Sequence, residues 1–157
     1  MTLELDTLET SFDLIAPRGE ELVDVFYARL FETAPAVQPL FANTDLRKQK
    51  SMLLATLVLL RKSLRDLEAI APKLRQLGAR HVAYGALPEH YPVVADVMLA
   101  SMAEIAGDAW THDIEAAWAA ALGLVATAML EGAEEAQAEA NRRPEPRPSH
   151  ATVAATA

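Results

Sequence analysis

Apolar residues recur every three or four positions along most of the chain, which is the spacing of one face of an α-helix. The strict alternation of apolar and polar residues that marks a β-strand is nearly absent. Prolines and glycines divide the helical pattern into segments. We therefore expect an all-α protein, with a short turn at residues 35–40 and helices at about residues 5–16, 18–34, 45–65, 72–85, 88–106 and from 112 onward.

Residues that favour helix ends support several of these boundaries. Pro72 is expected to open the fourth helix, because proline suits a first helical turn. Thr44 or Asp45 is expected to cap the third helix, and Thr111 the last one. Gly85 is expected to end the fourth helix, since glycine is common just after a helix C-terminus.

The composition of the chain changes near residue 137. Residues 141–157 are rich in proline, arginine, alanine and threonine, and they offer few apolar side chains to pack. Such a segment cannot bury enough apolar surface to offset the entropy of ordering it. We therefore expect a globular domain at residues 1–136 and a disordered tail at residues 137–157.

Charge and cysteine content exclude several classes of protein. The formal net charge is −8 at pH 7, which argues against a nucleic-acid partner. The chain has no cysteine, which excludes disulfides, thiolate catalysis, iron–sulfur clusters and covalently attached c-type haem. The acidic start lacks a signal-peptide pattern, and the longest apolar run, 52–60, is far below the roughly 20 residues of a membrane span. We expect a soluble, cytoplasmic protein without membrane insertion.

His81 is open to two interpretations. It shares a helical stripe with Leu74, Leu77, Gly78 and Tyr84, so its side chain should point inward. A histidine at such a position is commonly a core residue whose ring bonds a backbone carbonyl. A neutral imidazole in an apolar cleft is also what the iron of a non-covalent haem requires.

Three further polar side chains lie on apolar helix faces. Gln49 stands at the head of the face that contains Leu53, Tyr27 lies among apolar neighbours in the second helix, and Tyr91 begins the inner face of the fifth. Each has a structural explanation, since a glutamine at a helix start can face water and a buried tyrosine usually finds a carbonyl. The alternative is that a hydroxyl and an amide donate hydrogen bonds to a bound ligand.

Other kinds of site find little support. No two histidines stand three or four residues apart, and H-E-x-x-H is absent, so zinc remains a weak alternative. The chain also lacks a G-x-S-x-G turn, a P-loop and a G-x-G-x-x-G loop. Hydrolase and nucleotide-binding functions are therefore not indicated.

Six short blocks in a fixed order carry a more specific signal: FYARLF, PLF, KQKSML, ARHVAYG, EHYPVV and AAWAAALG. This order resembles the haem domain of bacterial flavohaemoglobins and single-domain bacterial haemoglobins, over about residues 5–135. The resemblance implies a globin fold, which is a 3-on-3 helical sandwich around non-covalent haem b (iron protoporphyrin IX). It covers nearly all of the predicted domain.

The resemblance also implies a role for individual residues. His81 in ARHVAYG matches the proximal histidine that binds the haem iron. Tyr27 in FYARLF and Gln49 in KQKSML match the distal pair that contacts bound oxygen. Phe41 in PLF matches the phenylalanine on the haem face, and Tyr91 in EHYPVV the proximal-side tyrosine. Six further residues are expected to line the haem: Leu53, Leu57, Leu77, Leu87, Val94 and Met98.

One position departs from the flavohaemoglobin pattern. In that family a glutamate of the last helix joins the proximal histidine and tyrosine and raises the basicity of the histidine. Alignment from Trp118 places Ala133 there, with Glu134 one residue further on. The glutamate that would support strong electron donation to the iron is therefore not at the expected position. Peroxidase-like chemistry, which depends on that donation, is not expected. The sequence also lacks motifs for FAD- and NAD-binding domains, so turnover would need an external reductase.

Three functions remain open at this point. The first is nitric oxide dioxygenation, supported by an external reductase. The second is storage, delivery or sensing of oxygen without turnover, with NO and CO as further ligands. The third is a haem-free helical interaction protein. A monomer and a homodimer are both compatible with the sequence.

Overall fold

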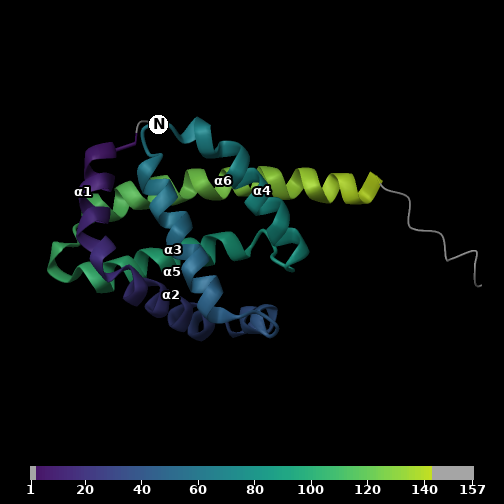
Figure 1. Ribbon diagram of the computed structural model, residues 1–157, viewed down its shortest axis with the longest axis horizontal. Coiled ribbons are helices and arrows are strands. Elements are labelled where there is room, and N and C mark those ends of the chain that lie inside the picture. The colour runs from purple at the N-terminus through teal and green to yellow at the C-terminus, as the bar shows by residue number, and fades with distance from the viewer. Residues whose placement is uncertain (1–2, 143–157) are drawn as a thin grey trace, which may run out of the picture.

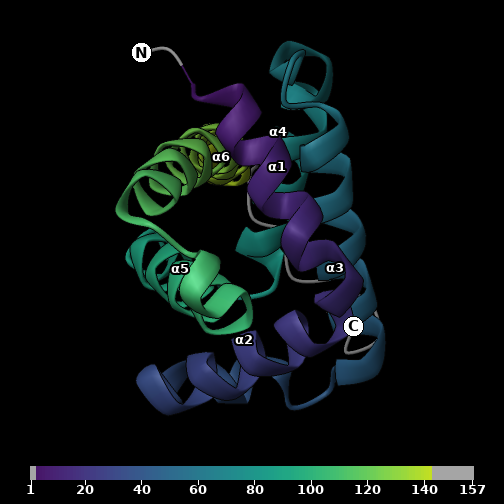
Figure 2. The same cartoon turned by 90° about the vertical axis from the view of Figure 1, so that its left-hand side faces the viewer.

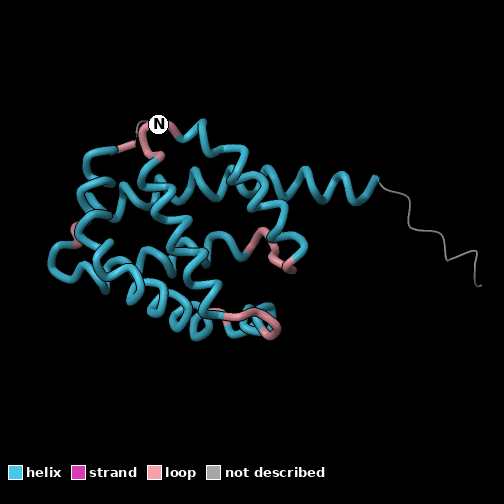
Figure 3. The backbone as a smooth tube through the Cα atoms, in the orientation of Figure 1, coloured by secondary structure: helices cyan, strands magenta, loops and turns pink. Residues whose placement is uncertain are grey.

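The computed structural model describes residues 3–142, and every regular element within that range is helical (Figure 3). Three short 3₁₀ segments connect the α-helices: η1 (Ala16–Arg18), η2 (Pro35–Phe41) and η3 (Gly107–Ala109). The α-helices are α1 (Leu5–Ile15), α2 (Gly19–Thr33), α3 (Leu46–Lys62), α4 (Leu67–Ala83), α5 (His90–Ala106) and α6 (His112–Arg142). The prediction of an all-α fold is confirmed.

The helices form the 3-on-3 sandwich of the globin fold (Figures 1 and 2). Helix α4 packs closely along α6, while α2 packs against α5 and α3. Helix α1 contacts α3, α5 and α6, so it joins the two layers. This arrangement brings helices that are distant in sequence together around one core, as ridges-into-grooves packing of helices requires.

The core is one apolar cluster to which all six α-helices contribute. Trp118 of α6 lies at its centre with 0% of its surface exposed. The Trp118 indole Nε1–H donates a hydrogen bond to Ser11 Oγ at 2.9 Å, and Ser11 Oγ–H donates to the Thr7 carbonyl at 2.7 Å. A buried indole N–H needs such a partner, so this bond fixes how α1 sits on α6.

Most helix ends lie where the capping residues predicted them. Asp45 Oδ1 accepts a hydrogen bond from the Arg47 amide at 3.0 Å, and Thr111 Oγ1 accepts one from the Ile114 amide at 3.2 Å. The prediction that Pro72 opens the fourth helix is wrong, because α4 begins at Leu67 and contains Pro72. The apolar stripe of α4 extends before the proline, and burial of Ile70 outweighs the loss of one helical hydrogen bond.

The C-terminal part of the chain remains helical further than expected. Helix α6 continues through residues 137–142, which the sequence assigns to the tail, and its last turns extend past the other helices (Figure 1). The rest of the predicted tail, residues 143–157, lies outside the described residues.

Among residues 3–142, α6 is the one helix long and apolar enough, by length and composition alone, to cross a membrane. Trp118 and Ala121 of α6 are buried in the core of the fold. Part of α6 therefore packs in the core, and 22% of its apolar stretch is buried in this structure.

Candidate functional site

The end of α4 is closed by a tight backbone turn just after His81. Gly85 has a φ of +90°, a region that glycine enters without a steric penalty. The Gly85 amide donates to the Val82 carbonyl at 3.1 Å, and the Ala86 amide donates to the His81 carbonyl at 2.9 Å. This pair of bonds is a Schellman motif. It fixes the last turn of α4, and therefore the backbone that carries the His81 ring.

The His81 ring is oriented by its own helix. His81 Nδ1 lies 2.7 Å from the Leu77 carbonyl oxygen, and because a carbonyl only accepts, Nδ1–H must be the donor. Burial lowers the pKa of His81, the bond to Leu77 opposes that shift, and nearby Arg80 adds to it. The ring is thus held as a neutral imidazole whose Nε2 lone pair is available to a ligand or a metal.

A tyrosine of α2 and a glutamine of α3 interact through their side chains. Tyr27 of α2 is 4% exposed, and its ring packs edge-on against Phe26 at 5.0 Å and Phe41 at 5.7 Å between ring centroids. Burial raises the pKa of Tyr27, and a hydrogen bond with the Gln49 side chain lowers it in part. The Tyr27 hydroxyl therefore stays protonated and can donate.

Gln49 lies in the first turn of α3, after the Asp45 cap. Its backbone N–H donates a hydrogen bond to the Asp45 carbonyl at 3.0 Å. The side chain is half-buried rather than turned fully into water. The structure thus brings together the two polar residues that the sequence singled out on separate helices. Their contact supplies a hydroxyl and an amide at one place.

The expected apolar lining residues divide into three groups by burial. Leu57 and Met98 lie in the buried core, and Phe41, Leu53 and Leu77 are half-buried. Leu87 and Val94 are exposed over 49% and 37% of their surface.

Exposed apolar surface gathers at the α4–α5 connection. Tyr84, whose ring lies 5.6 Å from the His81 ring between centroids, is also exposed. With Leu87 and Val94 it gives the region after His81 apolar surface that the rest of the fold does not cover.

Tyr91 near the start of α5 presents a buried hydroxyl oxygen without a hydrogen-bond partner among the described residues. Burial raises the pKa of Tyr91. Glu134 of α6 is exposed, and Ala133 beside it is half-buried. No carboxylate therefore joins Tyr91 within residues 3–142, and the departure noted in the sequence persists in the structure.

Sequence reasoning missed a role for His90. Its Nδ1 accepts a hydrogen bond from the Leu87 amide at 3.0 Å, so His90 organises the loop between α4 and α5. The position of His90 at the start of a helix, directly after the proline-containing segment 86–89, could have indicated this role.

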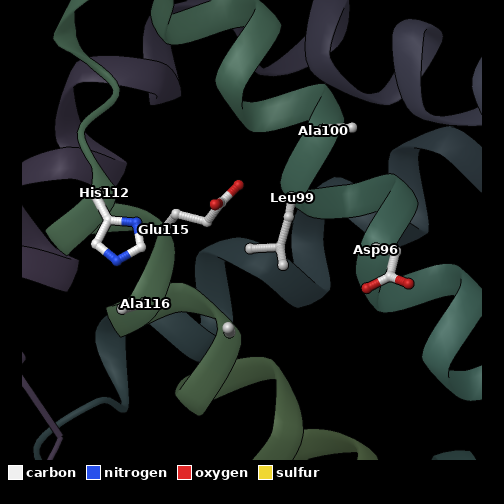
Figure 4. A pocket seen from close by; sticks show the side chains of 7 residues that line it. Asp96, Leu99, Ala100, His112, Glu115 and Ala116 are labelled. Carbon is white, nitrogen blue, oxygen red and sulfur yellow. The ribbon is translucent and has the colours of Figure 1, made fainter.

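Two shallow clefts lie between α5 and α6, and neither is lined by His81, Tyr27 or Gln49. In the first, His112 and Glu115 of α6 lie opposite Leu99 of α5 (Figure 4). The second is lined mainly by small and apolar side chains, together with Asp96, and reaches Tyr91. The α5–α6 clefts are therefore separate from His81, Tyr27 and Gln49, although the second shares Tyr91 with the expected site.

The donor set at His81 fits a haem iron better than a metal ion held by side chains alone. Within residues 3–142, no group of three or more histidine, aspartate or glutamate side chains is placed to hold a metal ion. A single imidazole holds iron firmly when a porphyrin supplies the other ligands. The exposed apolar surface around the α4–α5 connection suits a flat apolar group.

Comparison with known proteins bears on this interpretation. The family model described as Globin matches residues 24–129, which is more than half of the chain. The chain belongs to the globin family. This globin is 30% identical over 128 residues to a flavohemoprotein of Bacillus subtilis, an alignment that covers 80% of this chain and 32% of the relative. It is 34% identical over 114 residues to a flavohemoprotein of Deinococcus radiodurans, covering 71% and 28%.

Solved structures show the same fold at lower identity. An engineered carbene transferase made from a proposed nitric oxide dioxygenase of Rhodothermus marinus superposes with a TM-score of 0.82 at 20% identity, covering 90% of this globin and 100% of that chain. A bacterial globin from Campylobacter jejuni superposes with a TM-score of 0.73 at 22% identity, covering 83% and 94%. A flavohemoglobin of Malassezia yamatoensis with bound FAD and heme superposes with a TM-score of 0.72 at 20% identity, covering 88% and 37%. The chain spans about a third of the length of the curated flavohemoproteins it matches.

Proposed function

We propose that this globin binds haem b non-covalently through His81 and takes up oxygen and other diatomic gases on the opposite face. The observation that carries the proposal is the His81 imidazole, which is neutral, half-buried and bonded through Nδ1, so that Nε2 is available. Phe41, Leu53 and the apolar residues of the α4–α5 connection would hold the porphyrin. Membership of the globin family supports the same assignment.

The distal pair would determine how long a gas stays bound. When present, haem would supply ferrous iron that coordinates a diatomic ligand and exchanges electrons with it. The protonated Tyr27 hydroxyl and the Gln49 amide would donate hydrogen bonds to the partly negative outer atom of that ligand. Each such charge-assisted bond contributes about 1–3 kcal/mol, which would slow the release of oxygen.

The first candidate activity is nitric oxide dioxygenation. The overall reaction combines NO, O₂ and one electron to give nitrate, so each turnover needs one electron from a donor. The similarity to proteins named flavohemoproteins supports a flavin reductase as that donor. In this activity the Tyr27–Gln49 pair would hold oxygen and orient it toward the incoming nitric oxide.

A second candidate function, oxygen storage, delivery or sensing without turnover, is favoured by a different observation. The His81 Nδ1–H bonds a neutral carbonyl, and the Tyr91 hydroxyl has no carboxylate partner among residues 3–142. A carboxylate partner raises the basicity of a ligating histidine, whereas a carbonyl does so less. This arrangement suits reversible binding more than oxidative chemistry. For either function, we infer that the protein acts in the cytoplasm.

The deciding experiment is haem titration of the purified protein, followed by absorption spectra of the ferric, ferrous and oxygenated forms. We expect one haem per chain and a stable oxygenated spectrum. His81→Ala should abolish that spectrum, and free imidazole should restore part of it, whereas His112→Ala, which removes an exposed histidine of α6, should change nothing. Absence of stoichiometric haem uptake by the unsubstituted protein would refute the proposal.

Nitric oxide consumption then separates the two candidate functions. The oxygenated protein is mixed with nitric oxide, and nitrate is measured with and without a flavin reductase and NADH. Sustained nitrate production beyond one equivalent supports the dioxygenase. A single equivalent, followed by an unreduced ferric spectrum in the presence of an active reductase, supports binding without turnover.

A further inference from the structure

Helices α4 and α6 touch through their backbones at two glycines. A methyl group added at Gly78 of α4 would overlap the Met129 carbonyl group of α6. A methyl group added at Gly132 of α6 would overlap the Arg75 carbonyl group of α4. The two contacts are reciprocal, because each glycine faces the other helix about one turn away from its partner glycine. Both glycines are buried.

Glycine is unfavourable in the interior of a helix, so two such residues at one crossing indicate that the backbones must approach closely there. Gly123, also in α6, provides the contrast. A methyl group added at Gly123 would meet nothing within 4 Å. The close approach is therefore particular to the crossing of Gly78 and Gly132 rather than general to α6.

The crossing lies next to the residues that orient His81. Gly78 follows Leu77, whose carbonyl holds His81 Nδ1, and precedes His81 by three residues in the same continuous helix. An ion pair between Arg75 and Glu131, 3.1 Å between Nη2 and Oε2, spans the same two helices beside the contact. Since an α-helix moves as a stiff rod over one turn, a displacement at Gly78 is carried to the His81 ring.

We propose that Gly78 and Gly132 are positioning residues for His81, and that they set the position of the imidazole Nε2 that would bind the haem iron. The inference rests on the proposed function, in which His81 holds the iron. An added methyl group at either position pushes α4 away from α6 and moves the ring with it. Both glycines act on one helix separation, so their effects on the ring are coupled.

The test uses Gly78→Ala, Gly132→Ala and the double variant, with Gly123→Ala as the matched control on α6. Two properties are measured on the haem-loaded proteins: the rate of haem transfer to excess apomyoglobin, and the iron–histidine stretching band of the ferrous form in resonance Raman spectra. We expect haem loss to accelerate by about 10- to 100-fold in each single variant. The stretching band should shift or broaden, while Gly123→Ala leaves both properties unchanged.

The double variant distinguishes positioning from general loosening. If both methyl groups widen the same gap, the double variant should lose haem less rapidly than the product of the two single effects predicts. An unshifted band in a folded Gly132→Ala protein would overturn the inference, even if that protein is less stable. Unfolding of both single variants beside a folded Gly123→Ala would overturn it as well, since the glycines would then serve the whole fold.

Failure of the proposed function gives a different result. In that case the unsubstituted protein takes up no haem in the titration. Normal haem binding by the unsubstituted protein, together with unaltered haem loss and an unaltered stretching band in the glycine variants, overturns the positioning role alone.

Discussion

Replacing Ser11 with alanine should destabilise the fold, because Trp118 would keep a buried N–H without a partner. Trp118 is fully buried, Ser11 is 4% exposed, and the bond between Nε1 and Oγ is 2.9 Å long. An unpaired buried donor costs about 1–3 kcal/mol, and the better helix propensity of alanine returns a few tenths. We expect a net loss of about 1–2 kcal/mol, or roughly 2–8 °C in the unfolding temperature of a chain this size.

Ser101→Ala is the matched control for this prediction. Ser101 is also fully buried in a helix, but its hydroxyl donates only to the Val97 carbonyl of its own helix, at 2.7 Å. Removing that hydroxyl leaves no donor unpaired, so the change in stability should be close to zero. Thermal and urea unfolding of both variants, in the same haem state, measures the difference. Equal losses in the two variants would refute the assignment of the Ser11 effect to the tryptophan bond.

Three further predictions follow from particular contacts. Tyr27→Phe should speed oxygen dissociation about tenfold in stopped-flow measurements, because one donor to the ligand is lost, and an unchanged rate would contradict the distal role of Tyr27. A hydrogen bond from Arg61 holds the pKa of Asp13 below its ordinary 3.8. The pair therefore stabilises the fold above that pH, and this stabilisation is lost as the pH falls through the lowered pKa. Arg61→Met should make the free energy of unfolding less dependent on pH in this acid range, and an unchanged dependence would contradict the assignment. Gly85→Ala should cost about 1 kcal/mol in urea unfolding, because alanine is strained at a φ of +90°, and a neutral result would show that the turn can change shape.

The class of fold and most helix ends could be predicted from the amino-acid pattern alone, because both depend on local patterns. Apolar residues that recur about every 3.6 positions favour a helix whatever that helix packs against. A residue such as Asp45 caps the helix that it precedes. Gly85 could be predicted for the same reason, since a positive φ is a property of one residue. The predicted helix start at Pro72 is wrong because a proline ends a helix only where burial of the preceding residues does not outweigh the lost hydrogen bond.

The candidate site was only partly visible in the sequence. His81, Tyr27 and Gln49 were each ambiguous alone, and it was the order of the six blocks that singled them out. The contact of Tyr27 with Gln49 joins α2 to α3, and the lack of a hydrogen-bond partner for the Tyr91 hydroxyl within residues 3–142 depends on where α6 lies. Neither is therefore a local property. The roles that the resemblance implies for the lining residues remain predictions.

The distances between helices depend on packing and could not be predicted from local patterns. The amphipathic pattern of α4 shows which face is buried but carries no information about how closely a second helix can approach. The fit of Gly78 and Gly132 against opposing backbones is a property of two segments more than fifty residues apart, and it exists only once both helices are packed. The sequence gives the type of residue at each position, but close packing of the core determines which residues are in contact.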